Sequence, residues 1–138
     1  HYARIADKVI AECGGSVRGM IVAAWGLTFK ANTDDLRDSP AIKILLMLSD
    51  AGAIIRAYDP TAKSGYDAYP WITVLPSALD ACQGADALVL LTEWSEFAAI
   101  NPRDVSARMK SSRVVDSRNV LNKTAWLEAG FVHRGVGR

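Results

Sequence analysis

Short, uninterrupted apolar runs alternate along the chain with longer stretches in which apolar residues recur at helical spacing. Residues 20–25 and 87–91 are apolar throughout, which is typical of strands buried on both faces of a sheet. Between them, Ser39 and Pro40 open a segment with an apolar stripe that ends at Gly52. Serine is a preferred N-cap residue and proline presets the first-turn dihedral, so we expect a helix there with Ser39 as its N-cap.

The remaining segments continue this alternation. Ile5, Val9 and Ile10 fall on one helical face before Gly14 and Gly15, which predicts an opening helix that ends at the two glycines. Strands are expected at residues 53–58, 72–74, 113–115 and 131–136, and helices at about 77–82, 102–110 and 124–129. Alternating strands and helices predict an α/β protein, with a Rossmann-like parallel sheet covered by helices on both faces in three layers.

Composition and charge mainly exclude other classes of protein. The chain has 138 residues, 50% of them hydrophobic, which suits one domain, with residues 1–18 as a leading helix and connector. The net charge is +1 and the charges are interleaved, so we expect no nucleic-acid partner. No apolar run approaches the roughly 20 residues that cross a bilayer. Charges throughout residues 1–13 argue against a signal segment, so we expect a cytoplasmic protein without a membrane partner.

The cysteines and histidines form no recognisable catalytic or metal-binding pattern. Cys13 and Cys82 have no CxxC spacing and no nearby histidine pair, and His1 and His133 lie far apart. We therefore expect no metal site, no disulfide and no nucleophile with a base partner. Both cysteines are interpreted as buried thiols. The start at His1 rather than at a methionine suggests that a further part precedes the chain.

Candidate ligand-binding residues lie where loops leave the expected strands. Open α/β sheets bind ligands beyond the carboxyl ends of their strands. The loop of residues 26–38 carries Lys30 and Arg37, and Arg118 follows the strand at residues 113–115. In a parallel sheet, Lys30 and Arg118 emerge at the same edge. An arginine fork and a lysine charge at one edge, with free backbone N–H groups beside them, suit a diphosphate.

These charged residues also have a purely structural interpretation. In this interpretation the loop aspartates cap the following helix and pair with Arg37; they are Asp34, Asp35 and Asp38. From composition alone, this structural role and an anion-binding role for the loop have about even odds. For Lys30 or Arg118 taken singly, a solvated surface role is favoured over a ligand-binding role by about three to one. Only a shared placement at one sheet edge favours the anion site.

Asp59 and Trp94 have two interpretations each. Asp59 stands where a dinucleotide-binding fold places its ribose ligand, but Gly26 alone follows the first strand, without GxGxxG. A turn made by Asp59 and Pro60 is therefore favoured. Trp94 follows an apolar strand and either lines a pocket or, more commonly, closes off a core. The remaining tryptophans, Trp25, Trp71 and Trp126, are interpreted as packing residues.

Together these segments resemble the third, carboxy-terminal domain of the UDP-glucose/GDP-mannose dehydrogenase family. They follow the order of the family's motifs and span nearly the whole chain. The matching residues are Gly26-Leu27-Thr28-Phe29-Lys30, Thr33-Asp34-Asp35-Leu36-Arg37-Asp38-Ser39, Tyr58-Asp59-Pro60, Leu91-Thr92-Glu93-Trp94, Asp116-Ser117-Arg118-Asn119, Gly130-Phe131 and Gly135-Val136-Gly137-Arg138. The resemblance implies that residues 1–138 form a nucleotide-sugar (UDP)-binding domain at the carboxy terminus of such an enzyme.

The resemblance also implies roles for individual residues. Phe29, Lys30 and Arg118 correspond to nucleotide-sugar contacts in the family, and Arg37 corresponds to a residue that reaches toward NAD. The family most often has glycine where Ser117 stands. This departure affects the aim of the turn that carries Arg118, but not its charge.

The chemistry of a whole enzyme follows from the same resemblance. Family members oxidise the sugar C6 hydroxyl to a carboxylate in two steps, using two NAD molecules and a cysteine that forms a thiohemiacetal and a thioester. That cysteine lies in a glycine-rich motif upstream of the third domain. Neither Cys13 nor Cys82 has that context. No catalytic residue is therefore expected in this chain, NAD would be bound mainly by the first domain, and the chain would be inactive alone.

The substrate implied by the resemblance is UDP-glucose. Thr33-Asp34-Asp35-Leu36-Arg37 and Thr92-Glu93-Trp94 are most similar to the bacterial UDP-glucose enzymes, while GDP-mannose or a UDP-N-acetyl-hexosamine stays open. Family members form oligomers, so we expect a homo-oligomer, with the remaining domains of the same enzyme as partners, in polysaccharide biosynthesis. The rival hypotheses are an assembly module without ligand binding of its own and an independent NAD-binding domain, which the missing glycine fingerprint disfavours.

Overall fold

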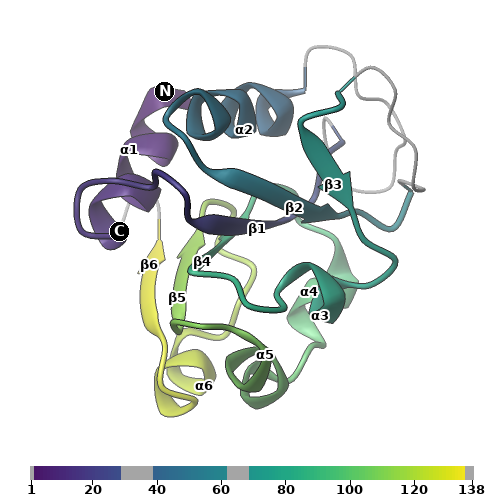
Figure 1. Ribbon diagram of the computed structural model, residues 1–138. Coiled ribbons are helices and arrows are strands. Elements are labelled where there is room, and N and C mark those ends of the chain that lie inside the picture. Colours follow the sequence, from purple (N-terminus) through teal and green to yellow (C-terminus); the bar gives the residue numbers. More distant parts are fainter. Residues whose placement is uncertain (1, 29–38, 62–68, 136–138) are drawn as a thin grey trace.

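The sheet of this protein is parallel throughout. In the computed structural model, which describes residues 2–28, 39–61 and 69–135, it has six strands in the order β3-β2-β1-β4-β5-β6 (Figure 1). Every pair of neighbouring strands runs parallel. The strands are β1 (Ile21–Trp25), β2 (Ile54–Tyr58), β3 (Ile72–Val74), β4 (Ala87–Leu90), β5 (Arg113–Asp116) and β6 (Val132–Gly135).

The two most apolar strands occupy the centre of the sheet. β1 lies between β2 and β4, with Trp25 opposite Tyr58 on one side and Leu90 on the other. All four residues of β4 are buried, as a strand covered on both faces requires. Strand order reverses between β1 and β4, because β2 and β3 lie on one side of β1 and β4 to β6 on the other.

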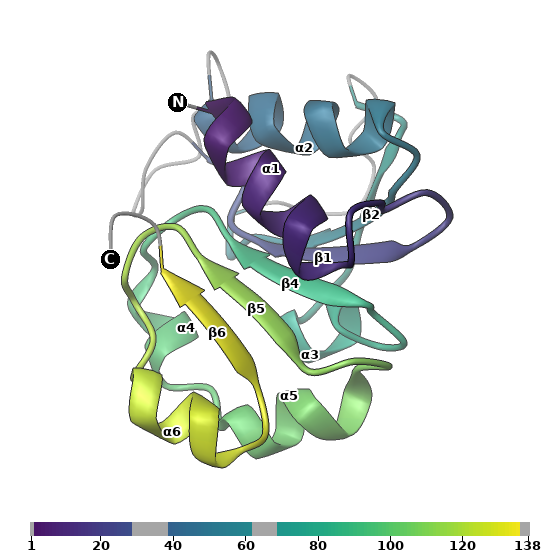
Figure 2. The ribbon, with the colours of Figure 1, turned by 90° about the vertical axis from the view of Figure 1, so that its left-hand side faces the viewer.

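Helices cover both faces, which confirms the predicted three-layer architecture. One face is covered by α1 and α2 and the other by α3, α5 and α6 (Figure 2). The side chains of β1 alternate between the two layers: Val22 and Ala24 face α1 and α2, whereas Ala23 and Trp25 face the opposite helices. The helices are α1 (Tyr2–Glu12), α2 (Pro40–Asp50), α3 (Ala78–Ala81), α4 (Ser95–Ala98), α5 (Pro102–Arg108) and α6 (Lys123–Glu128). No helix among the described residues is long and apolar enough to cross a membrane.

The opening helix α1 belongs to the core of the domain. Its residues Ile5, Ala6 and Val9 are buried in the same cluster as the inward side chains of α2. The aromatic ring of Tyr2 also lies beneath the Lys43 ammonium group of α2, 5.4 Å from it. The segment predicted as a leading helix therefore completes one helical layer of the sheet.

Two local features differ from the sequence-based expectations. The helix α4 was not predicted; it is a single turn that buries Phe97. Ser39 precedes α2 as predicted, but its side chain does not cap the helix. Instead the hydroxyl donates a 2.7 Å hydrogen bond to the carbonyl of Leu27, which is fully buried. A buried carbonyl needs a donor, so the serine holds the end of β1 against the start of α2.

Gly26 allows a close approach of two chain segments at the carboxyl ends of β1 and β4. Its φ of +102° lies in the left-handed region, where glycine carries no steric penalty. A Cβ at this position would also lie 2.8 Å from the backbone nitrogen of Thr92. Any other side chain would therefore separate the loops that follow the two central strands.

Replacing Gly26 with alanine should destabilise the fold by about 3 kcal/mol, because the left-handed backbone and the overlap with Thr92 each cost roughly 1–2 kcal/mol. Urea unfolding of the two proteins measures this difference. Gly14→Ala is the matched control, because Gly14 has a φ of +87° but no neighbouring atom within 4 Å of the added Cβ. Gly14→Ala should lower the free energy of unfolding by only about 1 kcal/mol. An equal loss of stability in the two variants would contradict the close contact between Gly26 and Thr92.

Candidate functional site

The loops that follow β1, β2, β4 and β5 gather at one edge of the sheet. All of these strands are parallel, so their carboxyl ends lie side by side. The edge includes the point between β1 and β4 at which strand order reverses. Open α/β sheets bind their ligands in the crevice at such a point, and the residues along this edge are therefore the candidate site.

A buried carboxylate joins two of these loops. Asp59, which is 1% exposed, follows β2. One of its oxygens accepts hydrogen bonds from the backbone N–H groups of Leu27 at 2.7 Å and Thr28 at 3.2 Å. The other accepts from the N–H and the hydroxyl of Thr61, at 2.9 and 2.7 Å. Asp59 thus forms the predicted turn and also anchors the loop after β1, which the sequence did not indicate.

A second buried carboxylate anchors the turn that carries Arg118. Asp116 ends β5 and is fully buried. Its oxygens accept hydrogen bonds from the backbone N–H groups of Arg118 at 3.1 Å and Leu121 at 2.8 Å. Asn119 between them has a φ of 56°, which asparagine tolerates better than most residues. The position of Arg118 is therefore set by a hydrogen-bonded turn.

Ser117 takes part in the same turn. Its hydroxyl and its backbone N–H both donate to the carbonyl of Leu90 at the end of β4. No left-handed backbone is needed at this position, since Asn119 is the one non-glycine residue with positive φ in the part of the chain that the structure describes. Serine thus fits where the family most often has glycine, and it ties the loop after β5 to β4.

Arg118 lies at the predicted edge, with its charge close to the surface. Its guanidinium group forms an ion pair of 3.0 Å with Glu93, which follows β4. The two side chains are 39% and 52% exposed. Exposed ion pairs contribute about 0–1 kcal/mol, so the pair with Glu93 holds the arginine only weakly. A ligand with a stronger negative charge would compete well for the same N–H groups.

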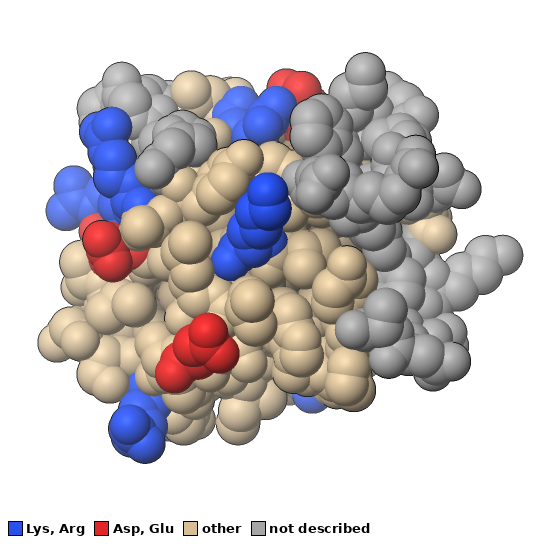
Figure 3. All heavy atoms as spheres, turned by 90° about the horizontal axis from the view of Figure 1, so that it is seen from above, with Lys and Arg blue, Asp and Glu red and all other residues tan. Residues whose placement is uncertain are grey.

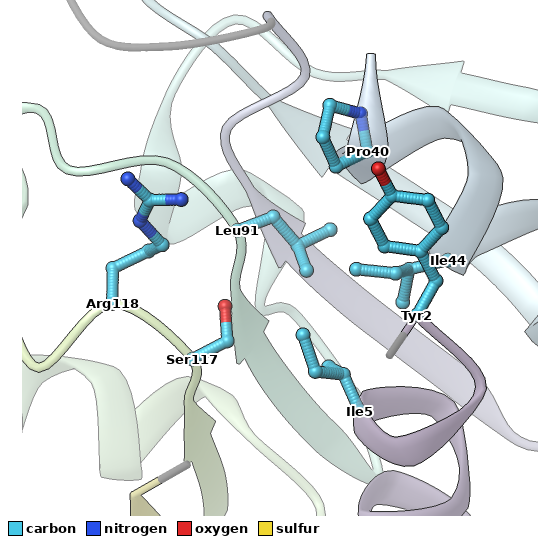
Figure 4. Close-up of a pocket in the computed structure, with 7 residues that line it drawn as sticks. All are labelled: Tyr2, Ile5, Pro40, Ile44, Leu91, Ser117 and Arg118. Atoms are coloured by element: carbon cyan, nitrogen blue, oxygen red, sulfur yellow. The ribbon is translucent and has the colours of Figure 1, made fainter. Parts of the chain in front are cut away.

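A cavity of about 240 Å³ lies beside Arg118. Figure 4 shows apolar side chains of α1 and α2 on one side of it and Ser117 and Arg118 on the other. The lining residues are Tyr2, Ile5, Pro40, Ile44, Leu91, Ser117 and Arg118. The cavity therefore combines an apolar wall with a cationic one. Sequence reasoning missed the contribution of α1, because nothing in its helical pattern indicates which strands it covers.

Three of the predicted ligand-binding residues lie outside the described part of the chain. They are Phe29, Lys30 and Arg37. Of the described residues beside this segment, Ser39 donates a hydrogen bond to the carbonyl of Leu27 at the site edge. The meeting of Lys30 and Arg118 around one pyrophosphate stays a prediction. The capping aspartates of the alternative interpretation, Asp34, Asp35 and Asp38, also fall in this segment.

Trp94 packs against the core, as the more common interpretation predicted. It is partly buried against the cluster that includes Phe97. Its indole nitrogen is buried and has no hydrogen-bond partner among the described residues. Trp25 and Trp126 are buried and in edge contact, with ring centroids 6.0 Å apart, and Trp71 packs at the border of the other core cluster. These three are packing residues, as expected.

The cysteines are buried thiols, also as expected. Cys13 is 6% exposed and Cys82 is fully buried. Burial raises the pKa of both thiols, that of Cys82 to about 12. A raised pKa disfavours the thiolate, which is the nucleophilic form. Within the described residues, no group of acidic, cysteine and histidine side chains is arranged to hold a metal ion.

The charged side chains are dispersed over at least one face of the molecule. Figure 3 shows the described lysines and arginines of the face above α1 and α2 as separate groups, with acidic side chains among them. The described charges on this face therefore form no continuous basic surface.

The fold and this edge define a Rossmann-like ligand-binding domain with an arginine at its switch-point edge. Residues 23–123 match the UDP-glucose/GDP-mannose dehydrogenase family, UDP binding domain. The chain belongs to this family.

Similar proteins of known sequence are longer than this chain. The UDP-glucose 6-dehydrogenase of Rhizobium meliloti is 45% identical over 134 residues, which cover 95% of this chain and 30% of that enzyme. The UDP-glucose 6-dehydrogenase of Pseudomonas aeruginosa is 40% identical over 131 residues, or 90% and 29% of the two chains. The chain thus spans about 30% of the length of the relatives it matches.

Solved structures of related enzymes share the fold. The NDP-N-acetyl-D-galactosaminuronic acid dehydrogenase of Methanosarcina mazei superposes with a TM-score of 0.81 at 26% identity, covering 100% of this chain and 29% of that one. The UDP-D-ManNAc dehydrogenase of Pyrococcus horikoshii gives a TM-score of 0.77 at 27% identity, covering 99% and 30%. Both likenesses extend over essentially the whole domain.

Asp59→Asn should destabilise the domain by about 3 kcal/mol, because the new amide group cannot accept all of the hydrogen bonds that the carboxylate accepts and leaves buried N–H groups unpaired. Chemical denaturation measures the change. Asp50→Asn, at the exposed end of α2, is the matched control and should stay within about 0.5 kcal/mol of the parent. A similar small effect at Asp59 would refute its anchoring role.

Proposed function

We propose that this chain is the carboxy-terminal, UDP-binding domain of an NAD-dependent UDP-glucose 6-dehydrogenase, which converts UDP-glucose to UDP-glucuronate and reduces two NAD molecules. Family membership supports the domain, and the two bacterial relatives named UDP-glucose 6-dehydrogenase support the substrate. In this proposal the chain contributes substrate binding, while the catalytic cysteine belongs to another part of the enzyme.

The observation that carries the proposal is the placement of Arg118. It stands at the carboxyl edge of the sheet, on a turn held by the buried Asp116, beside a cavity with one apolar wall. Arginine binds phosphate oxygens through two parallel N–H groups. Anchoring the backbone lowers the entropy lost on binding. We assign to Arg118 the role of binding the diphosphate of the nucleotide sugar.

Phe29 and Lys30 complete this proposed site. They follow Thr28 in sequence, and Thr28 is held at the site edge by Asp59. Lys30 would pair with the same diphosphate as Arg118, while the ring of Phe29 would contact the nucleotide. Arg37 would reach toward NAD bound by another domain.

The residues described here do not fit NAD in the manner of a dinucleotide-binding fold. The acidic residue after β2 binds the ribose in such folds, but Asp59 is buried and already accepts hydrogen bonds from Leu27, Thr28 and Thr61. The first strand is followed by Gly26 without a glycine fingerprint. We therefore place the main NAD site outside this chain, in keeping with a role in substrate binding.

A second candidate substrate is an N-acetylated UDP-hexosamine. It is favoured by the names of the two solved structures, both of which refer to N-acetylated sugars, although their identity of 26–27% is well below that of the UDP-glucose relatives. GDP-mannose is the third possibility within the family. The base and the sugar distinguish these substrates, whereas the diphosphate contact at Arg118 would be common to all.

The cellular setting belongs to the same proposal. We propose a cytoplasmic enzyme of polysaccharide biosynthesis that acts as a homo-oligomer, with this chain packed against the other domains. The two free, buried thiols are in keeping with a reducing compartment. Exposed apolar residues such as Leu46 and Ile54 are compatible with the alternative of an assembly module. A monomer in size-exclusion chromatography that binds UDP would argue against assembly as the main role.

Calorimetric titration with UDP tests the proposed site. Arg118→Ala should weaken UDP binding about tenfold to a hundredfold, because charge-assisted hydrogen bonds contribute roughly 1.5–3 kcal/mol. Arg108→Ala is the matched control: Arg108 is a similarly exposed arginine, paired with Asp80 at 3.5 Å, but it does not line the cavity. Unchanged binding after Arg118→Ala would remove the basis of the proposal.

Lys30→Ala should weaken UDP binding by a comparable factor, because both cations are proposed to neutralise one diphosphate. The same titration measures it. Loss of binding in the arginine variant with full binding in the lysine variant would contradict a shared site.

GDP and NAD are titrated alongside UDP: preference for GDP would favour GDP-mannose, and tight NAD binding without UDP affinity would instead support an independent NAD-binding domain.

A further inference from the structure

A second, smaller cavity lies at the free edge of the sheet. β6 is the last strand in the sheet order, and Figure 2 shows it at the edge, with α1 and α6 on opposite faces. The cavity has a volume of about 120 Å³ and is lined by Lys8, Lys123, His133, Arg134 and Gly135. It shares no lining residue with the cavity beside Arg118.

Three of the lining side chains are cationic, and they come from three different elements. Lys8 belongs to α1, Lys123 to α6 and Arg134 to β6. Successive side chains of a strand point to opposite faces. Arg134 accordingly reaches Glu12 of α1, while His133 lies near Asp116, on the face covered by α6. The cations therefore approach the strand edge from both sides.

Among the described residues, a single carboxylate, that of Glu12, forms an ion pair with one of these three cations, Arg134. The ammonium group of Lys8 donates to the carbonyl of Gly135 at 3.1 Å, which orders the side chain without neutralising it. Lys123 is exposed and forms no ion pair within residues 2–28, 39–61 and 69–135. At least one cation is thus available to an anion from solution.

The carboxylate of Asp116 does not supply the missing charge. It is fully buried behind His133, with an oxygen 3.8 Å from the imidazole Nε2. Both of its oxygens accept backbone N–H groups of the Arg118 turn. His133 lines the cavity, whereas Asp116 does not.

We propose that this cavity binds a phosphate-sized oxyanion, either inorganic phosphate or the end of a phosphomonoester. Lysine supplies three N–H donors and arginine five, and here they surround a small space from several directions, as a tetrahedral oxyanion requires. The volume of about 120 Å³ is half that of the cavity beside Arg118 and suits a small ion.

Titration of the 138-residue chain with inorganic phosphate, followed by NMR of the His133 imidazole, tests this site. We expect a saturable shift of the His133 resonance. The double variant Lys8→Gln/Lys123→Gln should bind phosphate at least about tenfold more weakly, because two charge-assisted contacts are lost. Absence of a saturable shift in the parent protein would overturn the proposal.

Two control variants separate this site from other cations. Lys110→Gln removes an exposed lysine that lines neither cavity, and phosphate binding should change less than about twofold. Arg118→Ala should leave the phosphate-dependent shift of His133 intact, although it weakens UDP binding. Equal weakening by Lys110→Gln, or loss of the shift in Arg118→Ala, would refute a separate site.

Two further measurements complete the test. Lys123→Gln alone replaces an exposed side chain and leaves the packing of α1 untouched, so a loss of phosphate affinity of about threefold or more in this folded variant supports the site even if the double variant does not fold. An unchanged affinity would contradict it. Methyl phosphate distinguishes the ligand source: binding like that of phosphate indicates a phosphomonoester end, and phosphate binding alone indicates the free ion.

Discussion

Two buried aspartates at the carboxyl ends of parallel strands organise the candidate site. A carboxylate away from water is stable only when hydrogen-bond donors surround it. Asp59 after β2 and Asp116 at the end of β5 obtain these donors from backbone N–H groups of the loops at the same edge. The hydrogen bonds to these buried carboxylates therefore hold the loops in place. The position of Arg118 and the close approach of Gly26 to the loop after β4 both depend on this arrangement.

The overall fold was predictable because short apolar runs alternate along the chain with segments of helical periodicity, the pattern of a parallel sheet covered by helices. The edge position of Arg118 followed directly, since parallel strands end on the same side. Its ion pair with Glu93 did not follow, because it depends on β4 and β5 being neighbours, and periodicity does not fix strand order. α4 was missed because four residues are too short for a periodic signal. The capping role predicted for Ser39 was wrong because the buried Leu27 carbonyl takes the serine hydroxyl as its donor.

These features are in keeping with the proposed division of labour between this chain and the other domains of a dehydrogenase. Two positions that bind the dinucleotide in other Rossmann-like sheets have different roles here. Asp59 after β2 stabilises the neighbouring loops, and Gly26 alone stands where such folds have the GxGxxG sequence. The edge is left with a cationic side chain and an apolar wall. Such a surface suits a phosphorylated ligand with a ring system. The same architecture that binds cofactor in other proteins is thereby suited to substrate.

The two cysteines lie in different cores. Cys13 packs in the cluster between the sheet and α1 and α2, and Cys82 in the cluster on the opposite face. A buried thiol reacts with an external reagent only when its surroundings open. The chain contains no other cysteine, so the reactivity of each thiol reports on the opening of one helical layer. Pulsed alkylation would therefore reveal whether the two layers loosen together or one before the other.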